Sequence, residues 1–196
     1  MFNKNEVIKI VENEIEELVN DFKKHPFKHR VEHSFHCELY NRLVKHEELN
    51  QYYSLIDGYT TQLIHKEWPA CKLEEVDTRR GNIDLVILSD ESIENSDLEL
   101  FRLGDIKPFI AIEIGLNYDV KHMIKDIEKL NKVESYRSYI IHLDNKDHYN
   151  KTYEDIQQEI KKNSIGDNLK IAYISVPLKG DIGYIKHLND SEVNPF

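Results

Sequence analysis

The sequence predicts an α/β fold in which a mixed central sheet is flanked by helices. Two observations predict it. Apolar residues recur at helical spacing through the first fifty residues, and later short runs rich in β-branched residues alternate with further helical patterns. The chain has 196 residues, of which 40% are hydrophobic and 32% are charged. This length suffices for one sizeable core. We therefore expect a single domain over residues 1–196, with its core at about 31–178.

Two helices are expected before any strand. Residues 4–23 carry apolar side chains along one helical face, and Pro26 separates this helix from the next element. The second helix is expected over 31–49, because Val31, Phe35, Leu39 and Leu43 fall on one face. Residues 50–61 are expected to be irregular, since they include an Asp-Gly turn signal.

The rest of the chain is expected to alternate between strands and helices. The expected strands are 62–68, 82–88, 108–116, 135–143 and 169–178, and the expected helices are 119–134 and 152–163. The acidic segment 89–106 is expected to be an exposed connection. The polar tail 179–196 is expected to be loosely ordered. Three successive strands predict an antiparallel meander, and the later strand–helix–strand units predict parallel crossovers.

Composition and targeting signals narrow the class of protein. The net charge of −10 argues against a protein whose whole surface grips nucleic acid, although a local basic patch remains compatible with it. No apolar run approaches the roughly 20 residues that span a bilayer, and we expect no membrane association. Cys37 and Cys71 share no short metal-type spacing, which favours a reduced, cytoplasmic protein without structural disulfides.

Two acidic residues stand inside otherwise apolar strands. They are Asp84 in NIDLVIL and Glu113 in FIAIEIGL. A buried carboxylate is costly unless it is paired or bound to metal, and Mg²⁺ is a cation that takes oxygen ligands of this kind. The pattern therefore indicates a divalent-cation site. The alternative is that each acid points outward or pairs with Arg79 or Arg80, which immediately precede the second strand.

The order of these motifs resembles that of the PD-(D/E)XK nuclease superfamily. The matching segments are VEHSFHCELYNRL, RRGNIDLVI, FIAIEIGL and KDIEKL, within residues 31–143. The resemblance implies a restriction-endonuclease-like αβββαβ core, to which this chain adds an N-terminal helix (4–23) and a C-terminal helix and strand. It also implies that Asp84 and Glu113 bind Mg²⁺ or Mn²⁺ and that a glutamate of the first core helix completes the metal shell. The resemblance favours Glu32 over Glu38 for that role, because related sequences carry a glutamate just ahead of the apolar stripe.

One position departs from the family pattern. Where the family has a lysine two residues after the glutamate, this chain has Gly115, which we expect to leave an empty position on that strand face. Either a lysine of the following helix replaces it or catalysis is lost. Lys121 and Lys125 stand in the first turns of that helix, and Lys129 lies deeper, in Asp-x-x-Lys.

The sequence thus predicts a metal-dependent nuclease with Glu32, Asp84, Glu113, Lys121 and Lys129 as catalytic candidates. Nucleic acid is the expected partner, with DNA favoured over RNA. A homodimer is common for such folds, but this is an analogy and leaves the oligomeric state open. Arg79 and Arg80 are candidates for contacting the substrate phosphate. The rival hypothesis is a catalytically inactive binding or assembly module on the same fold.

Two weaker groups were weighed as well. The residues His25, His29, His33 and His36 with Cys37 suggest a zinc cluster, but Pro26 interrupts their register and satisfied or solvated histidines are favoured. Glu67 is a further candidate acid on the first strand, for which a solvated strand position is the favoured interpretation.

Overall fold

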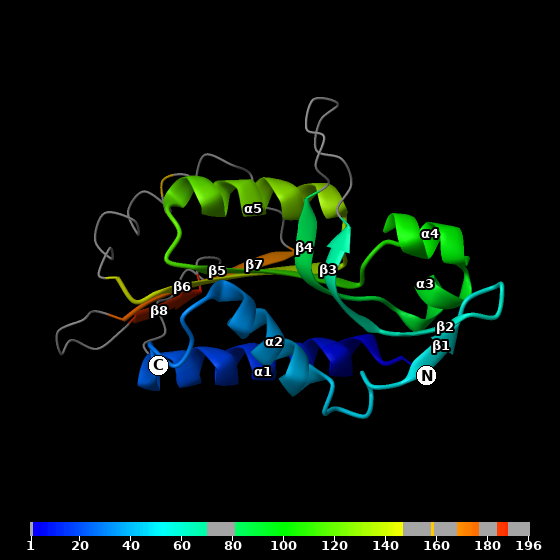
Figure 1. The fold of residues 1–196 in the computed structure, drawn as a ribbon, viewed down its shortest axis with the longest axis horizontal. Helices are drawn as coiled ribbons and strands as arrows, with labels where there is room; N and C mark the ends of the chain where they lie inside the picture. Colours follow the sequence, from blue (N-terminus) through cyan, green and yellow to red (C-terminus); the bar gives the residue numbers. More distant parts are fainter. Residues whose placement is uncertain (1, 70–80, 147–157, 159–167, 177–183, 188–196) are drawn as a thin grey trace.

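The computed structural model describes residues 2–69, 81–146, 158, 168–176 and 184–187. Within these ranges it is a mixed α/β structure with one large sheet and a separate two-stranded sheet, which confirms the expected mixed central sheet flanked by helices (Figure 1).

The element bounds follow the sequence order. The helices are α1 (Lys4–Lys24), α2 (Glu32–Leu43), α3 (Asp90–Glu94), α4 (Leu98–Leu103) and α5 (Val120–Val133). The strands are β1 (Tyr52–Ser54), β2 (Thr60–Gln62), β3 (Ile64–Pro69), β4 (Asn82–Ile87), β5 (Ile110–Leu116), β6 (Arg137–Asp144), β7 (Leu169–Ser175) and β8 (Tyr184–His187).

The large sheet has the strand order β3-β4-β5-β6-β7-β8. The strands β3, β4 and β5 pair antiparallel, whereas β5, β6 and β7 pair parallel. Both the predicted meander and the predicted parallel pairing are therefore confirmed. Helix α5 covers one face of the sheet, while α1 and α2 cover the other (Figure 1). Side chains from β4 and β5 can thus meet helices from both layers.

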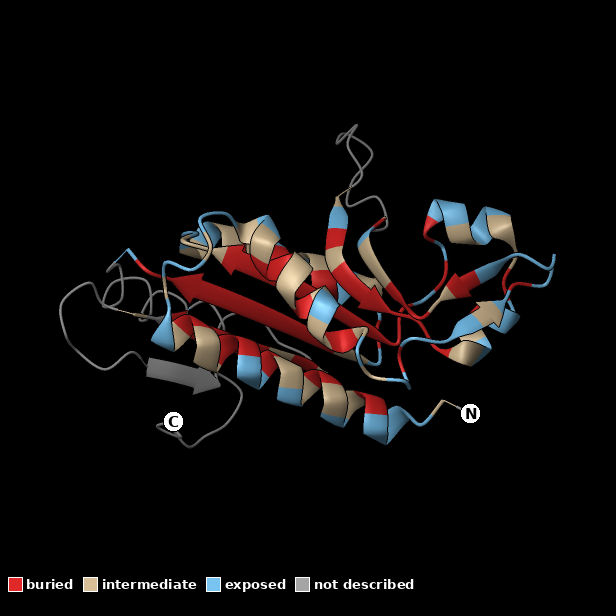
Figure 2. Ribbon diagram, turned by 60° about the horizontal axis from the view of Figure 1, so that its bottom comes forward, coloured by how far each residue is buried: buried red, intermediate tan, exposed pale blue. Residues whose placement is uncertain are grey.

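Helix α1 forms because its apolar residues fall on one stripe and its ends are capped. The Asn3 side chain accepts a hydrogen bond from the backbone N–H of Glu6, which satisfies one of the free donors at the helix start. The stripe is buried against the rest of the fold, and the opposite side of the helix faces solvent (Figure 2). Its buried members are Val7, Val11, Ile15, Leu18, Val19 and Phe22.

Four local expectations are corrected by the structure. The second helix ends at Leu43 rather than at 49, and the chain continues in turns that bury Leu49. The segment 50–61 contributes β1 and the start of β2, two strands that pair with each other. The acidic connection 89–106 contains α3 and α4, which are capped by the side chains of Ser89 and Asp97. The polar tail includes β8, which pairs antiparallel with β7. The predicted helix 152–163 lies almost entirely outside the described residues.

Candidate metal centre

The candidate site lies where β4 and β5 separate. Their ladder pairs Ile87 with Ile110, Val86 with Ala111 and Leu85 with Ile112. The register between β4 and β5 ends there, so Asp84 and Glu113 are not paired with each other, although Glu113 pairs with Ile140 of β6. In place of a ladder bond, the Asp84 carboxylate accepts the backbone N–H of Ile114 at 2.7 Å. This separation of β4 from β5, here called the strand fork, directs the two acidic side chains toward the same region.

The Asp84 and Glu113 carboxyls interact directly, as the sequence predicted for a shared site. Burial, followed by the charge of Asp84, raises the pKa of Glu113 well above its ordinary value. Burial also raises the pKa of Asp84 to about 6, although the Ile114 N–H opposes that shift. The charge of Asp84 thus disfavours the ionised form of Glu113, whereas a hydrogen bond with Glu113 favours the ionised form of Asp84. The two acids therefore share one site, at which a cation stabilises their ionised forms.

Helix α5 brings a lysine to the same two carboxylates. The Lys129 Nζ lies 2.7 Å from the Glu113 Oε1, as an ion pair outside hydrogen-bond geometry, and donates a hydrogen bond to the Asn82 carbonyl at 3.0 Å. The buried Asp126, one helical turn earlier, lies 3.8 Å from the same ammonium group. Burial lowers the pKa of Lys129, but the Glu113 carboxylate raises it more, so the pKa lies above its ordinary value. Lys129 is therefore a fixed cation at the acidic pair.

The other two lysines considered from the sequence do not join this cluster. Lys121 and Lys125 are exposed on α5, and no hydrogen bond or ion pair within the described ranges links them to Asp84 or Glu113. The remaining sequence candidates, Arg79 and Arg80, lie outside the described residues.

Helix α2 supplies the third acid from the opposite face of the sheet. The Glu32 carboxylate accepts the backbone N–H of Leu116 at 3.3 Å, beyond the point where β4 leaves β5. One turn further along α2, the His36 Nε2 lies 3.7 Å from the Glu32 Oε1 and 3.4 Å from the Asp84 Oδ2. These three side chains bring one potential ligand atom each to within 4.8 Å of one another. Asp84 therefore links the α2 side of the site to Glu113 and Lys129.

The other candidate acid of α2, Glu38, lies on a different flank of that helix from Glu32, as expected. Its carboxylate is held by Lys28 at 2.9 Å, by Arg42 at 2.8 Å and by a short contact with His29. These partners overcome the opposing effect of burial and hold the pKa of Glu38 at about 2. The ion-pair cluster connects the segment after α1 to α2, which is a structural role.

The expectation of an empty position at Gly115 is wrong. Gly115 pairs with His142 of β6, and a Cβ atom at Gly115 would lie 2.5 Å from the His142 Nε2. The imidazole is buried and lies 3.4 Å from the Asp126 carboxylate. The neighbouring ring thus occupies the space in which the family's lysine would begin. This packing could not be seen in the sequence, because His142 is 27 residues away and only strand register brings it there.

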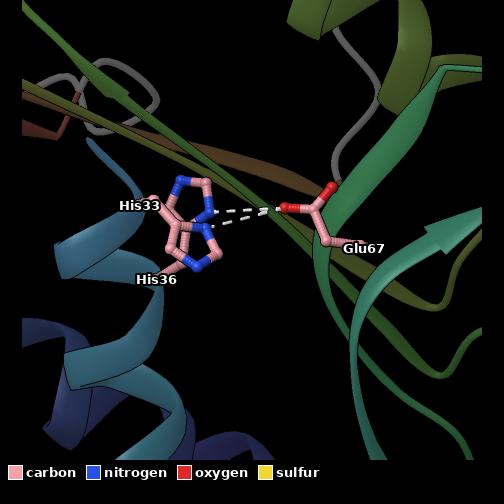
Figure 3. A group of neighbouring side chains, drawn as sticks. All are labelled: His33, His36 and Glu67. Atoms are coloured by element: carbon pink, nitrogen blue, oxygen red, sulfur yellow. Dashed lines mark ion pairs between the residues drawn. The ribbon is translucent and has the colours of Figure 1, made fainter. Parts of the chain in front are cut away.

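A second group of side chains lies on the other side of the His36 ring. The Nδ1 of His36 and the Nδ1 of His33 lie 3.9 Å and 4.0 Å from the Glu67 Oε1, respectively (Figure 3). Glu67 is an exposed residue of β3, as the favoured interpretation expected, and its carboxylate also faces the two imidazoles. Of the five-residue zinc cluster considered above, only His33 and His36 come together here, since His29 contacts Glu38 and Cys37 contacts Lys66.

Sequence reasoning missed His36, Asp126 and His142 as members of the site. The His-x-x-His spacing of His33 and His36 was the one available signal, because residues three apart lie on the same helix face. The cluster brings carboxylate, imidazole and ammonium groups together, and Glu32, His36 and Asp84 are placed so that they could hold a metal ion.

Comparison with known proteins gives no family assignment. The chain matches no protein-family model, no curated protein and no solved structure. Within the described residues, every helix is too short or too polar to serve as a membrane span.

Proposed function

We propose that this protein is a metal-dependent phosphodiesterase that hydrolyses nucleic-acid backbones. The observation that carries the proposal is the meeting of Asp84, Glu113 and Lys129 at the fork between β4 and β5, with the Lys129 Nζ 2.7 Å from Glu113. The resemblance to the PD-(D/E)XK superfamily supports the same function. In that arrangement the acids hold the metal and a lysine stands beside them.

The donor set indicates what each residue would do. Asp84 and Glu113 would hold a Mg²⁺ or Mn²⁺ ion, with Glu32 completing the shell from α2. A metal bound there polarises a phosphate oxygen and lowers the pKa of a bound water. Backbone N–H donors at Ile114 and Leu116 fix the orientation of Asp84 and Glu32, so these carboxylates are organised in advance.

Lys129 would take the role that the family gives to the strand lysine. It approaches from α5, on the sheet face opposite α2, and its ammonium group is fixed by Glu113 and the Asn82 carbonyl. A cation placed in advance stabilises the charge that develops on the phosphate in the transition state. Asp126 and His142 would position Lys129 through the side of α5 that faces β6.

The substrate is proposed to be nucleic acid, with DNA favoured over RNA. The net charge of −10 repels a polyanion at long range, so binding would depend on the metal and on local cations. We expect weak, strongly salt-dependent binding in the absence of metal.

The test is cleavage of labelled double-stranded DNA, single-stranded DNA and RNA by the full chain with Mg²⁺ or Mn²⁺. We expect metal-dependent cleavage of at least one substrate, lost in Asp84→Asn and Glu113→Gln, with Lys125→Ala as the matched control that retains activity. Calorimetry should show Mg²⁺ or Mn²⁺ binding that weakens sharply in Asp84→Asn. A folded parent protein that cuts none of these substrates with either metal would refute the proposal.

A second candidate function is a non-catalytic binding or assembly module. Gly115 favours it, because the usual lysine is absent and His142 fills the space. On this hypothesis the cleavage assays are negative for every variant, while fluorescence anisotropy still detects binding to one nucleic acid.

A further inference from the structure

The imidazole of His36 presents an unusual electrostatic problem. It is 3% exposed, and neither ring nitrogen has a hydrogen-bond partner. Both nitrogens nevertheless face carboxylates: Nε2 faces Asp84 and Glu32, and Nδ1 faces Glu67.

A neutral imidazole carries one proton, so one of its nitrogens must present a lone pair to an anionic oxygen. That contact is repulsive unless a cation lies between the two atoms. The Nε2 is 3.4 Å from the Asp84 Oδ2, close to hydrogen-bond distance, and is the natural position for the proton. The Nδ1 is 3.9 Å from the Glu67 Oε1, which is too far for a hydrogen bond.

A metal ion fits the longer gap. Metal–ligand bonds of about 2.0–2.2 Å place two ligands of one tetrahedral ion about 3.3–3.5 Å apart, so Nδ1 and Oε1 need to approach by about half an ångström. The Nδ1 of His33 lies 4.0 Å from the same carboxylate oxygen, and all three ligand atoms lie within 4.8 Å of one another. The side chains of His33 and Glu67 are 62% and 48% exposed, which leaves them room for that adjustment.

The backbone also directs Glu67 toward this position. Glu67 has a φ of 51°, in the left-handed region, although it lies within strand β3. The resulting side chain extends from the sheet edge toward α2, where His33 and His36 lie on one face (Figure 3). A non-glycine residue in this region is strained and is found at ligand sites more often than elsewhere.

We propose that His33, His36 and Glu67 form a second divalent-metal site, suited to Zn²⁺ or a similar transition metal rather than Mg²⁺. Two imidazoles and one carboxylate are a donor set that zinc uses in sites with an open position for water. Mg²⁺ prefers oxygen ligands and is disfavoured by two nitrogen donors. The metal would link α2 to β3.

Such an ion would also act on the neighbouring acidic pair. With Nδ1 bound to metal, the remaining proton of His36 is fixed on Nε2, where it is donated to the Asp84 carboxylate. Histidine ligands commonly donate their second N–H to a carboxylate in this way. The site is independent of the proposed cleavage reaction, since it requires neither Glu113 nor Lys129.

The test is a calorimetric titration of the metal-free full chain with Zn²⁺ in the presence of excess Mg²⁺, which keeps the oxygen-rich site occupied. We expect one Zn²⁺ per chain. His33→Ala and Glu67→Gln should each weaken binding by more than the roughly 10- to 100-fold that loss of an outer partner costs. Both side chains are half-exposed, so these variants should keep the fold, which a circular-dichroism melt verifies.

Two control variants separate this site from others. Glu113→Gln removes a ligand of the proposed nuclease centre and should leave Zn²⁺ binding unchanged. His25→Ala removes an exposed histidine at the end of α1, outside both metal groups, and should also have no effect. A chain that cuts no nucleic acid but binds Zn²⁺ in this pattern would refute only the proposed function.

Histidine ¹⁵N NMR identifies the metal-bound atom. We expect Zn²⁺ to shift the Nδ1 signals of His33 and His36 and to leave the Nε2 of His36 protonated. The proposal is overturned by an absence of Zn²⁺ binding, by unchanged affinity in His33→Ala and Glu67→Gln, or by metal bound to the His36 Nε2. The last result would assign the ring to the Asp84 and Glu32 site instead.

Discussion

Gly115 offers the sharpest test of the packing at the candidate site. A Cβ atom at this position would lie 2.5 Å, 2.7 Å and 3.0 Å from the Nε2, Cδ2 and Cε1 atoms of His142. Contacts this short cannot be tolerated, so the ring must move. It is 2% exposed and lies 3.4 Å from Asp126, so any movement disturbs a packed layer between β6 and α5. Overpacking of this kind typically costs about 1–3 kcal/mol.

We therefore expect Gly115→Ala to lower the free energy of unfolding by about 1–3 kcal/mol, as measured by urea denaturation. Gly81→Ala is the matched control, because a Cβ there meets nothing within 4 Å, and its effect should be near zero. In a His142→Ala background the cost of Gly115→Ala should largely disappear, because the clashing ring is gone. An equal cost in both backgrounds would refute the assignment of the clash to His142.

The same geometry bears on the missing lysine. Gly115→Lys would have to displace His142 and bury an ammonium group, so we expect it to destabilise the fold more than Gly115→Ala does. We also expect it to give no gain in nucleic-acid cleavage. A stable Gly115→Lys protein that cuts DNA only after this substitution would show instead that the chain is a silenced nuclease and that the native site is inactive.

Three further predictions concern the charged groups of the site. Lys129→Met should reduce metal-dependent cleavage by about a hundred- to a thousandfold, or roughly 3–4 kcal/mol in the barrier, while Lys125→Met has no effect in the same assay. Glu38→Gln should lower the free energy of unfolding by about 1–2 kcal/mol at pH 7 and have little effect on cleavage. Glu32→Gln should reduce cleavage and have little effect on the free energy of unfolding. Because the pKa of Glu38 is depressed, its stabilisation is present above about pH 4.5 and is lost as the pH falls toward 2, which acid titration of the parent and Glu38→Gln can compare. Because the pKa of Asp84 is raised, its ionisation destabilises the metal-free fold. This destabilisation is absent below about pH 3.8 and grows to about 3 kcal/mol above pH 6. Asp84→Asn should therefore be more stable than the parent at pH 8, as measured by urea denaturation. Equal stability of Asp84→Asn and the parent at pH 8 would contradict the burial and charge repulsion inferred for Asp84.

Local sequence patterns were sufficient for the long elements. Helix α1, strand β5 and helix α5 follow from periodicity and capping residues, because each has a continuous apolar stripe or run. The short elements were missed because their hydrogen bonds are made with partners distant in sequence or by side-chain caps. Strand β8, for example, is formed by pairing with β7.

The candidate site divides in the same way. Asp84 and Glu113 could be chosen from the sequence, because a carboxylate in an otherwise apolar strand is unusual. Glu32 was chosen through the resemblance to the PD-(D/E)XK superfamily. The choice of Lys129 over Lys121 required the structure. Lys121, Lys125 and Lys129 all lie on α5, and only the position of α5 across the sheet shows that Lys129 reaches Glu113.

The sequence by itself determined the α/β class and the acidic pair, since both depend on local alternation of apolar and charged residues. Only the tertiary structure decided what surrounds that pair. The ring of His142 beside Gly115 results from strand register, and the contacts of His36 with Glu67 and Asp84 result from the packing of α2 over the separation of β4 and β5. Such contacts depend on the relative placement of elements far apart in the chain, which no local pattern of residues specifies.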